Sequence, residues 1–133
     1  MTMGVRAAVL GADGTVLLVR HTYTPGWHLP GGGVEPGETI HDALAKELRE
    51  EANIAITGEA SLHGVFLNRH VSRRDHVAVF VVRAFVQIAP HVPDREIAEA
   101  RFFPLAALPD ATTPGTRRRL AEICDGAARH TEW

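Results

Sequence analysis

A glycine-rich loop that runs directly into an acidic helix constrains this chain more than any other feature. The loop is Gly32–Glu38, and the helix that follows it carries the run Lys46–Glu51 near its end. Because residues three and four positions apart share one helix face, Glu47, Glu50 and Glu51 are expected to lie together. The segment therefore predicts a tight loop beside a cluster of three carboxylates.

The three glutamates continue the apolar face of this helix. At about 100° per residue, Glu51 falls between Ile40 and Leu44. A solvated acidic helix, the ordinary alternative, would place its acids on the opposite face. Like charges at these spacings repel, and burying them without a counter-charge is more unfavourable still. A cation bound by carboxylate oxygens removes both penalties, which predicts a Mg²⁺ site, with Mn²⁺ as a substitute.

The segment Gly32–Ile54 resembles the Nudix box, which is a glycine, five residues, a glutamate, seven residues, then Arg-Glu-aliphatic-x-Glu-Glu-x-Gly-aliphatic. Two positions depart from it: Lys46 stands at the arginine and Asn53 at the last glycine. Asparagine tolerates the left-handed conformation that ends a helix, and lysine keeps the charge but loses the planar fork. The matching positions are Gly32, Glu38, Glu47, Leu48, Glu50, Glu51 and Ile54.

Two flanking segments, Trp27–Gly31 and Ala100–Leu105, also resemble those of Nudix proteins. The resemblance implies an α/β fold, with a mixed sheet between helices in an α/β/α sandwich. It also implies Mg²⁺-dependent hydrolysis of a phosphoanhydride (pyrophosphate) bond in a nucleoside diphosphate linked to another moiety. A nucleoside triphosphate, a nucleotide sugar and a dinucleotide all remain open as the substrate.

The resemblance further assigns roles to residues of the box. Glu47, Glu50 and Glu51 would share metal binding and catalysis, with the carbonyl of Gly32 as a further metal ligand. The division of these roles is open, and Glu47 is our first choice for the general base. The supporting residues are Glu38 and Lys46.

Two other function classes stay open beside the enzyme. A Nudix-like domain can bind a nucleotide as a sensor without cleaving it, but such domains typically lose box carboxylates, and this chain keeps all three. A purely structural acidic helix in a protein-interaction domain would not need the glycine loop.

Candidate substrate-binding residues lie outside the box. Three arginines could hold phosphate, since a guanidinium group forms bidentate hydrogen bonds with it: Arg20, Arg73 and Arg74. Each of them also fits a solvated surface position. Trp27 could stack on a base or pack in the core. Glu96 precedes the last strand and is a candidate for an additional acid. The basic run Arg117–Arg119 is interpreted as a solvated face of the last helix.

Length and charge narrow the remaining choices. The 133 residues predict one Nudix domain spanning residues 1–133, and a net charge of −2 disfavours binding to a nucleic-acid polymer. The expected partner is a small-molecule nucleotide, and a homodimer is left open. A single cysteine, no targeting segment and no membrane-length apolar run predict a cytoplasmic protein.

The expected elements follow from apolar periodicity and turn residues. Two strands are expected to form a hairpin around Asp13-Gly14. The box helix is expected to begin after Thr39 as its N-cap. The expected ranges are strands Val5–Leu10, Thr15–Arg20, Trp27–Leu29 and Ala98–Phe103, extended structure in Ala55–His70 and His76–Ile88, and helices ending at about Ala52 and Ala128.

Overall fold

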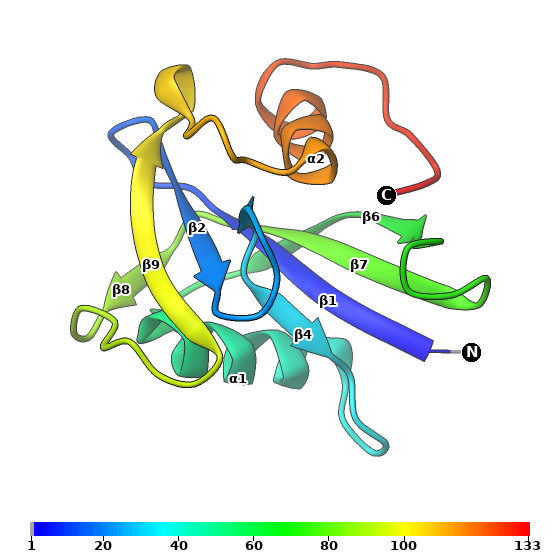
Figure 1. Ribbon diagram of the computed structural model, residues 1–133, viewed down its shortest axis with the longest axis horizontal. Coiled ribbons are helices and arrows are strands. Elements are labelled where there is room, and N and C mark those ends of the chain that lie inside the picture. The colour runs from blue at the N-terminus through cyan, green and yellow to red at the C-terminus, as the bar shows by residue number, and fades with distance from the viewer. Residues whose placement is uncertain (1) are drawn as a thin grey trace.

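The computed structural model describes residues 2–133 and contains short and long strands interleaved with two α-helices (Figure 1). The helices are α1 (Ile40–Ala52) and α2 (Pro114–Cys124), with a 3₁₀ turn at Leu105–Ala107. The strands are β1 (Thr2–Val9), β2 (Thr15–His21), β3 (Trp27–His28), β4 (Gly31–Gly33), β5 (Ile54–Ile56), β6 (Ala60–Leu67), β7 (Asp75–Val82), β8 (Phe85–Gln87) and β9 (Ile97–Pro104).

The main sheet has the strand order β4-β1-β7-β6. In it, β1 and β7 are parallel, whereas the β1–β4 and β6–β7 pairs are antiparallel. Two smaller sheets have the orders β3-β2-β9 and β5-β8. Figure 1 shows α1 below the strands and α2 above them. This mixed sheet between helices confirms the predicted α/β sandwich. No helix within residues 2–133 has the length and apolar character needed to cross a membrane.

The prediction that β1 and β2 pair as a hairpin was wrong. The turn itself forms, with the backbone N–H of Gly11 donating to the carbonyl of Thr15 at 2.9 Å. Beyond it the two strands join different sheets, and only an isolated bridge between Leu10 and Val16 connects them. The reason is long-range pairing, because β1 finds its partners in β4 and β7, and β2 finds its partners in β3 and β9.

The box helix has the predicted ends. Thr39 is the N-cap, and its side chain accepts a hydrogen bond from the backbone N–H of Asp42 at 3.0 Å. Asn53 ends the helix in the left-handed conformation, with φ 54° and ψ 37°. Asparagine thus fills the place of the usual glycine because its short polar side chain tolerates this conformation.

Two apolar layers hold the helices against the strands. On one face, Leu44 and Leu48 of α1 are fully buried among strand residues such as Val5 and Phe80. On the other face, Leu120 of α2 packs in a second cluster with strand residues. The periodic apolar positions of the sequence therefore form the core and fix α1 beside β4.

The last helix ends at Cys124, short of the predicted Ala128. The chain turns at Gly126, whose φ is 70°, and then runs back beside β6. There the N–H of Leu67 donates to the carbonyl of Thr131 at 3.0 Å, and the N–H of Trp133 donates to the carbonyl of Leu67 at 2.9 Å. Pairing with β6 therefore takes the place of further helical turns.

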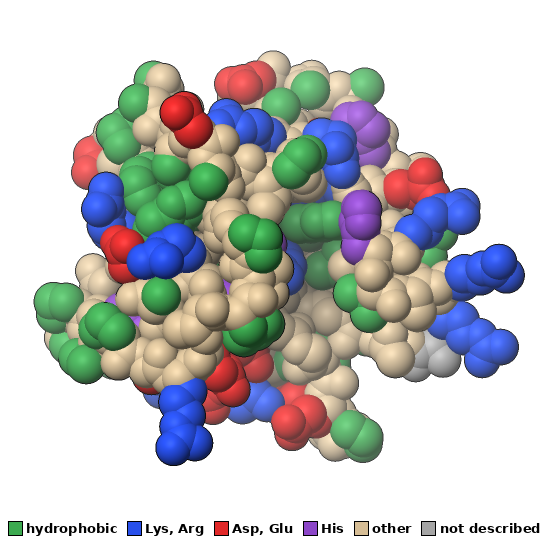
Figure 2. All heavy atoms as spheres, viewed as in Figure 1, with side chains coloured by type: hydrophobic (Ala, Val, Ile, Leu, Met, Phe, Trp, Pro, Cys, Tyr) green, Lys and Arg blue, Asp and Glu red, His purple; other side chains and the backbone are tan. Residues whose placement is uncertain are grey.

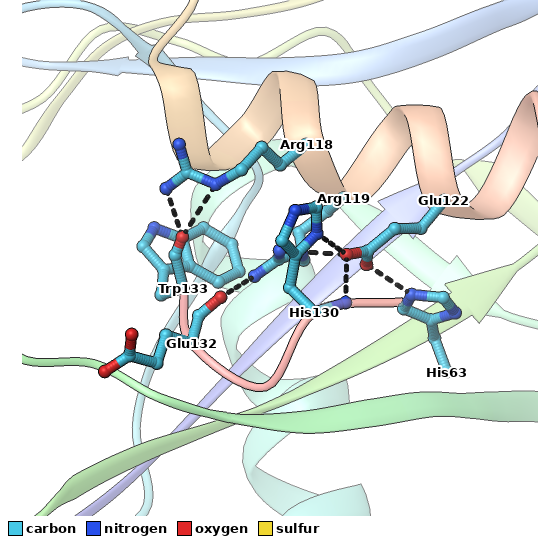
Figure 3. Close-up of polar contacts among 7 residues, drawn as sticks. All are labelled: His63, Arg118, Arg119, Glu122, His130, Glu132 and Trp133. Carbon is cyan, nitrogen blue, oxygen red and sulfur yellow. Dashed lines mark hydrogen bonds and ion pairs between the residues drawn. The ribbon is translucent and has the colours of Figure 1, made fainter. Parts of the chain in front are cut away.

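Arg119 corrects the interpretation of Arg117–Arg119 as a solvated face, because its side chain is fully buried. Its guanidinium lies 3.9 Å from the centre of the Phe66 ring and pairs with Glu122 at 3.0 Å. Glu122 also contacts His63 at 2.8 Å and His130 at 2.6 Å (Figure 3). Burial of this arginine is tolerated because a buried carboxylate neutralises it.

Candidate functional site

The acidic face of α1 lies against the glycine strand β4. Glu51 is 5% exposed, and its Oε2 accepts a hydrogen bond from the backbone N–H of Gly31 at 3.1 Å. Glu47 lies one turn earlier, and a Cβ atom on Gly32 would come within 2.6 Å of its carboxyl carbon. Only glycine therefore lets the loop backbone approach this carboxylate so closely.

A pocket of about 470 Å³ brings the three box glutamates together with a second acidic segment. Glu47, Glu50 and Glu51 contribute from α1, and Glu96 contributes from the loop between β8 and β9. Figure 2 shows acidic side chains along the lower edge of the molecule, where α1 lies in Figure 1. The structure thus places the candidate additional acid beside the box carboxylates, with Asp94, Arg95 and Ile97 completing the lining.

Burial and mutual repulsion change the acidity of two of these glutamates. Burial raises the pKa of Glu51, and although the Gly31 hydrogen bond lowers it, the nearby charge of Glu47 contributes to a pKa of about 8. The pKa of Glu47 is also raised, first by burial and then by the charge of Glu50. Both groups therefore hold protons more tightly than an ordinary glutamate does.

No counter-charge within ion-pair distance relieves this repulsion. Among residues 2–133, none of Glu47, Glu50 and Glu51 forms a salt bridge. In the same part of the chain, no three His, Cys, Asp or Glu side chains are gathered closely enough to hold an ion by themselves. The donor set suits a hard cation, but its carboxylates would have to turn toward one.

The two supporting residues tie the loop to the helix. The Nζ of Lys46 lies 3.0 Å from Glu38 and 3.8 Å from Glu35. Glu38 also accepts a hydrogen bond from the backbone N–H of Glu35 at 2.9 Å, and this bond, followed by the contact with Lys46, lowers its pKa. Lys46 therefore neutralises acids of the loop.

The four candidate substrate-binding residues do not line the acidic pocket. Arg20 on β2 pairs with Glu99 on β9 at 2.8 Å. Trp27 is mostly buried, with its ring centre 4.8 Å from that of Phe103. The remaining two, Arg73 and Arg74, are exposed in the turn between β6 and β7.

Arg6 is a residue that sequence reasoning missed. It lines a second and larger pocket, and its Nη1 donates to the carbonyl of Leu29 at 2.5 Å. Burial lowers its pKa, while the charges of Glu51, Glu47 and Asp75 act to raise it. A signal was available, because Arg6 is the only charged residue in the otherwise apolar run Val5–Leu10.

The chain is similar to known proteins in sequence and in fold. A relative in Bacillus subtilis, provisionally named as an 8-oxo-dGTP diphosphatase, is 27% identical over 95% of the chain and 82% of its own length. An ADP-ribose pyrophosphatase of Methanocaldococcus jannaschii is 33% identical over 76% of the chain, which spans only 61% of that protein. The crystal structure of a MutT NUDIX hydrolase from Burkholderia pseudomallei superposes with a TM-score of 0.78 and 30% identity, covering 92% of this chain and 97% of that one.

The family model described as NUDIX domain matches residues 1–123, which include both the glycine strand and the acidic helix. The chain therefore belongs to the NUDIX domain family.

Proposed function

We propose that the protein hydrolyses a phosphoanhydride bond in a nucleoside diphosphate linked to another group, with Mg²⁺ as its cofactor. Nucleoside triphosphates, nucleotide sugars and dinucleotides belong to this class. The names of its relatives support the proposal, because 8-oxo-dGTP and ADP-ribose both contain such a bond. The family match also supports a single catalytic domain over the matched residues.

One observation carries the proposal. Glu47, Glu50, Glu51 and Glu96 line one pocket, and the pKa values of Glu47 and Glu51 are raised. Burial of the Glu47 and Glu51 carboxylates is favourable when they are protonated or when a cation joins them. A bound cation also suits a substrate with negatively charged phosphates, because the cation attracts them.

The residues present fit a divalent cation at this place. Glu47, Glu50, Glu51 and the carbonyl of Gly32 would hold it, all through oxygen atoms, which Mg²⁺ prefers. When bound, such an ion neutralises phosphate charge and makes a coordinated water more acidic. Gly32 is suited to this role because it has no side chain between its backbone and Glu47.

The chain's own groups would then position the reaction and move its proton. The N–H of Gly31 fixes the Glu51 carboxylate. Glu47 is half-buried and has a raised pKa, so it can accept a proton from an attacking water more readily than an ordinary glutamate. Glu96 faces these acids from another loop and offers a further carboxylate.

The test is hydrolysis of a substrate panel by the purified protein. A nucleoside triphosphate, a nucleotide sugar and a dinucleotide polyphosphate are incubated with Mg²⁺, with Mn²⁺ or with excess chelator, and the products are separated by anion-exchange chromatography. We expect metal-dependent release of a nucleoside monophosphate from at least one substrate class. Cleavage that persists in chelator, or nucleotide binding without any cleavage, would overturn the proposal.

A further inference from the structure

A second pocket, of about 760 Å³, is larger than the acidic one. Its lining residues come from the start of β1, from the β4–α1 loop and from the turn that joins β6 to β7. Figure 1 shows these segments on the same side of the molecule. Pro36 from the loop and Val71 from the turn contribute apolar lining, and Val71 is 66% exposed. Apolar groups at two sides of an open pocket suit a flat ring, such as a nucleobase.

Gly32 lies between groups of the two pockets. Its backbone lines the larger pocket, while its Cβ position points at Glu47 of the acidic one. Because β4 is the edge strand of the main sheet, a ligand can pass over it from one face to the other. Gly4 also lines the larger pocket and adds no side chain to it, so the route stays open.

At the far end of this route lies Asp75, the first residue of β7. Gly32 is paired with Val5, whereas Asp75 is paired with Thr2. Three residues along β1 and two strand spacings therefore separate Gly32 from Asp75, which is roughly 14 Å on standard strand dimensions. An extended nucleotide with its phosphates at the box glutamates spans such a distance and brings its base to Asp75.

Asp75 lines the pocket and is held in place by hydrogen bonds. It is 7% exposed, and the Thr2 hydroxyl donates to its Oδ1 at 2.5 Å. The N–H of Asn68 donates to its backbone carbonyl at 2.9 Å, which fixes the main chain. An ionised carboxylate only accepts hydrogen bonds, so it favours a base edge that presents donors.

The common bases differ in this respect. Guanine presents two neighbouring donors, the N1–H and the 2-amino group, whereas adenine presents one donor beside an acceptor nitrogen. A carboxylate accepts both guanine donors, but it meets the adenine acceptor with an oxygen lone pair. Among the described residues that line the pocket, Arg6 carries the only positive charge, so the wall also offers a donor to a carbonyl or phosphate oxygen.

We propose that Asp75, held by Thr2, reads the base of the substrate and selects guanine nucleotides. The inference rests on the proposed function, because it takes the phosphates to lie at the box glutamates. The same edge is present in 8-oxoguanine, since oxidation at C8 changes neither donor. Asp75 is therefore a specificity residue for the guanine edge and does not sense the oxidation.

Wild-type protein tests the inference through two substrates. GTP and ITP differ only in the 2-amino group, so the ratio of their kcat/KM values isolates that donor. We expect GTP to exceed ITP by roughly tenfold or more, the scale of one well-placed hydrogen bond to a charged group. Equal values for GTP and ITP would overturn the role of Asp75.

The Asp75→Asn variant tests the residue itself. Its amide presents one acceptor and one donor, which suits adenine and opposes one guanine donor. We expect the GTP-to-ATP ratio of kcat/KM to fall by roughly tenfold or more, mainly through KM. Asp110→Asn makes the same change at an exposed position outside the pocket and should keep the wild-type ratio. An unchanged ratio in folded Asp75→Asn would contradict the inference.

Equilibrium binding separates failure of this inference from failure of the proposed function. Displacement of a fluorescent guanine nucleotide by GTP, ITP or ATP reports base selection without any need for cleavage. If GTP competes best but no nucleotide is cleaved, the base-reading role stands and the hydrolase proposal fails. If cleavage occurs and GTP, ITP and ATP displace the probe with equal affinity, the hydrolase proposal stands and the base-reading role of Asp75 fails.

Discussion

The Cβ position of Gly32 lies 2.6 Å from the carboxyl carbon of Glu47, closer than any real side chain could approach. The box glycine and the box glutamate are therefore fitted to each other across β4 and α1. A methyl group at Gly32 has to displace the carboxylate or the strand. This contact explains why a loop without side chains must precede the acidic helix.

We expect Gly32→Ala to lower turnover at least tenfold at saturating substrate and Mg²⁺, because a displacement near 1 Å can cost a hundredfold in rate. Gly33→Ala is the matched control, since a Cβ there meets no atom within 4 Å. Its turnover should stay within about threefold of wild type. Equal turnover in the two variants would show that the contact with Glu47 is not needed.

Glu50→Gln and Glu51→Gln should each lower turnover at least a hundredfold, because loss of one charge weakens a hard-cation site. The metal-free Glu51→Gln protein should nevertheless melt close to wild type at pH 7, since Glu51, with a pKa of about 8, is already largely neutral there. Glu59→Gln, at an exposed position, is the control. Wild-type rates in either folded site variant would remove that residue from the site.

Mg²⁺ should raise the melting temperature, and more so at high pH. The folded-state pKa of Glu51 is about 8, above its ordinary value of 4.5, so the folded protein binds the extra proton between these values. Metal-free stability therefore falls as pH rises through this window, and Mg²⁺ replaces the lost proton. Calorimetry at pH 6 and pH 8.5 measures the difference. A triple Gln variant at positions 47, 50 and 51 should show no Mg²⁺ effect, and an equal effect there would place the ion elsewhere.

Lys46 should support turnover by holding the loop that carries Glu35 and Glu38 against α1. Lys46→Ala removes the contacts with Glu38 and Glu35, and we expect turnover to fall by about tenfold or more. Lys46→Arg keeps the charge and adds a planar fork, so it should preserve or modestly raise turnover. Steady-state kinetics at saturating Mg²⁺ compare the two variants. Unchanged turnover in Lys46→Ala would make Lys46 an ordinary surface residue.

Glu122 should govern stability and not turnover. Burial alone would raise its pKa, but the hydrogen bonds from His63 and His130 and the charge of Arg119 outweigh burial and lower it to about 2. Glu122→Gln leaves the Arg119 guanidinium without its counter-charge, a loss of about 3–5 kcal/mol in the free energy of unfolding.

The effect of Glu122 should disappear in acid. Its folded pKa is depressed, so its contribution is present above about pH 4.5 and is lost as pH falls toward 2. Denaturant titrations of wild type and Glu122→Gln should therefore converge at low pH. Glu132→Gln, which removes an exposed partner of Arg69, is the control and should change stability little. A constant gap at all pH values would contradict the assignment.

The sequence by itself determined the box helix and its acidic face, because these depend on neighbours three and four residues apart. Thr39 and Asn53 predicted its ends, and the spacing of Glu47 and Glu51 predicted carboxylates on the face that meets the glycine strand. Hydrogen bonds at helix ends and helix periodicity are local, so a sequence displays them directly.

Only the tertiary structure decided which distant groups meet. Strand partners placed β1 and β2 in different sheets, brought Glu96 beside the box glutamates and put Arg6 and Asp75 in one pocket. Arg119 was interpreted as solvated because the sequence does not reveal that Phe66 and a chain segment folded back along β6 cover its side chain. Such contacts depend on the packing of the whole chain, and local periodicity carries no information about them.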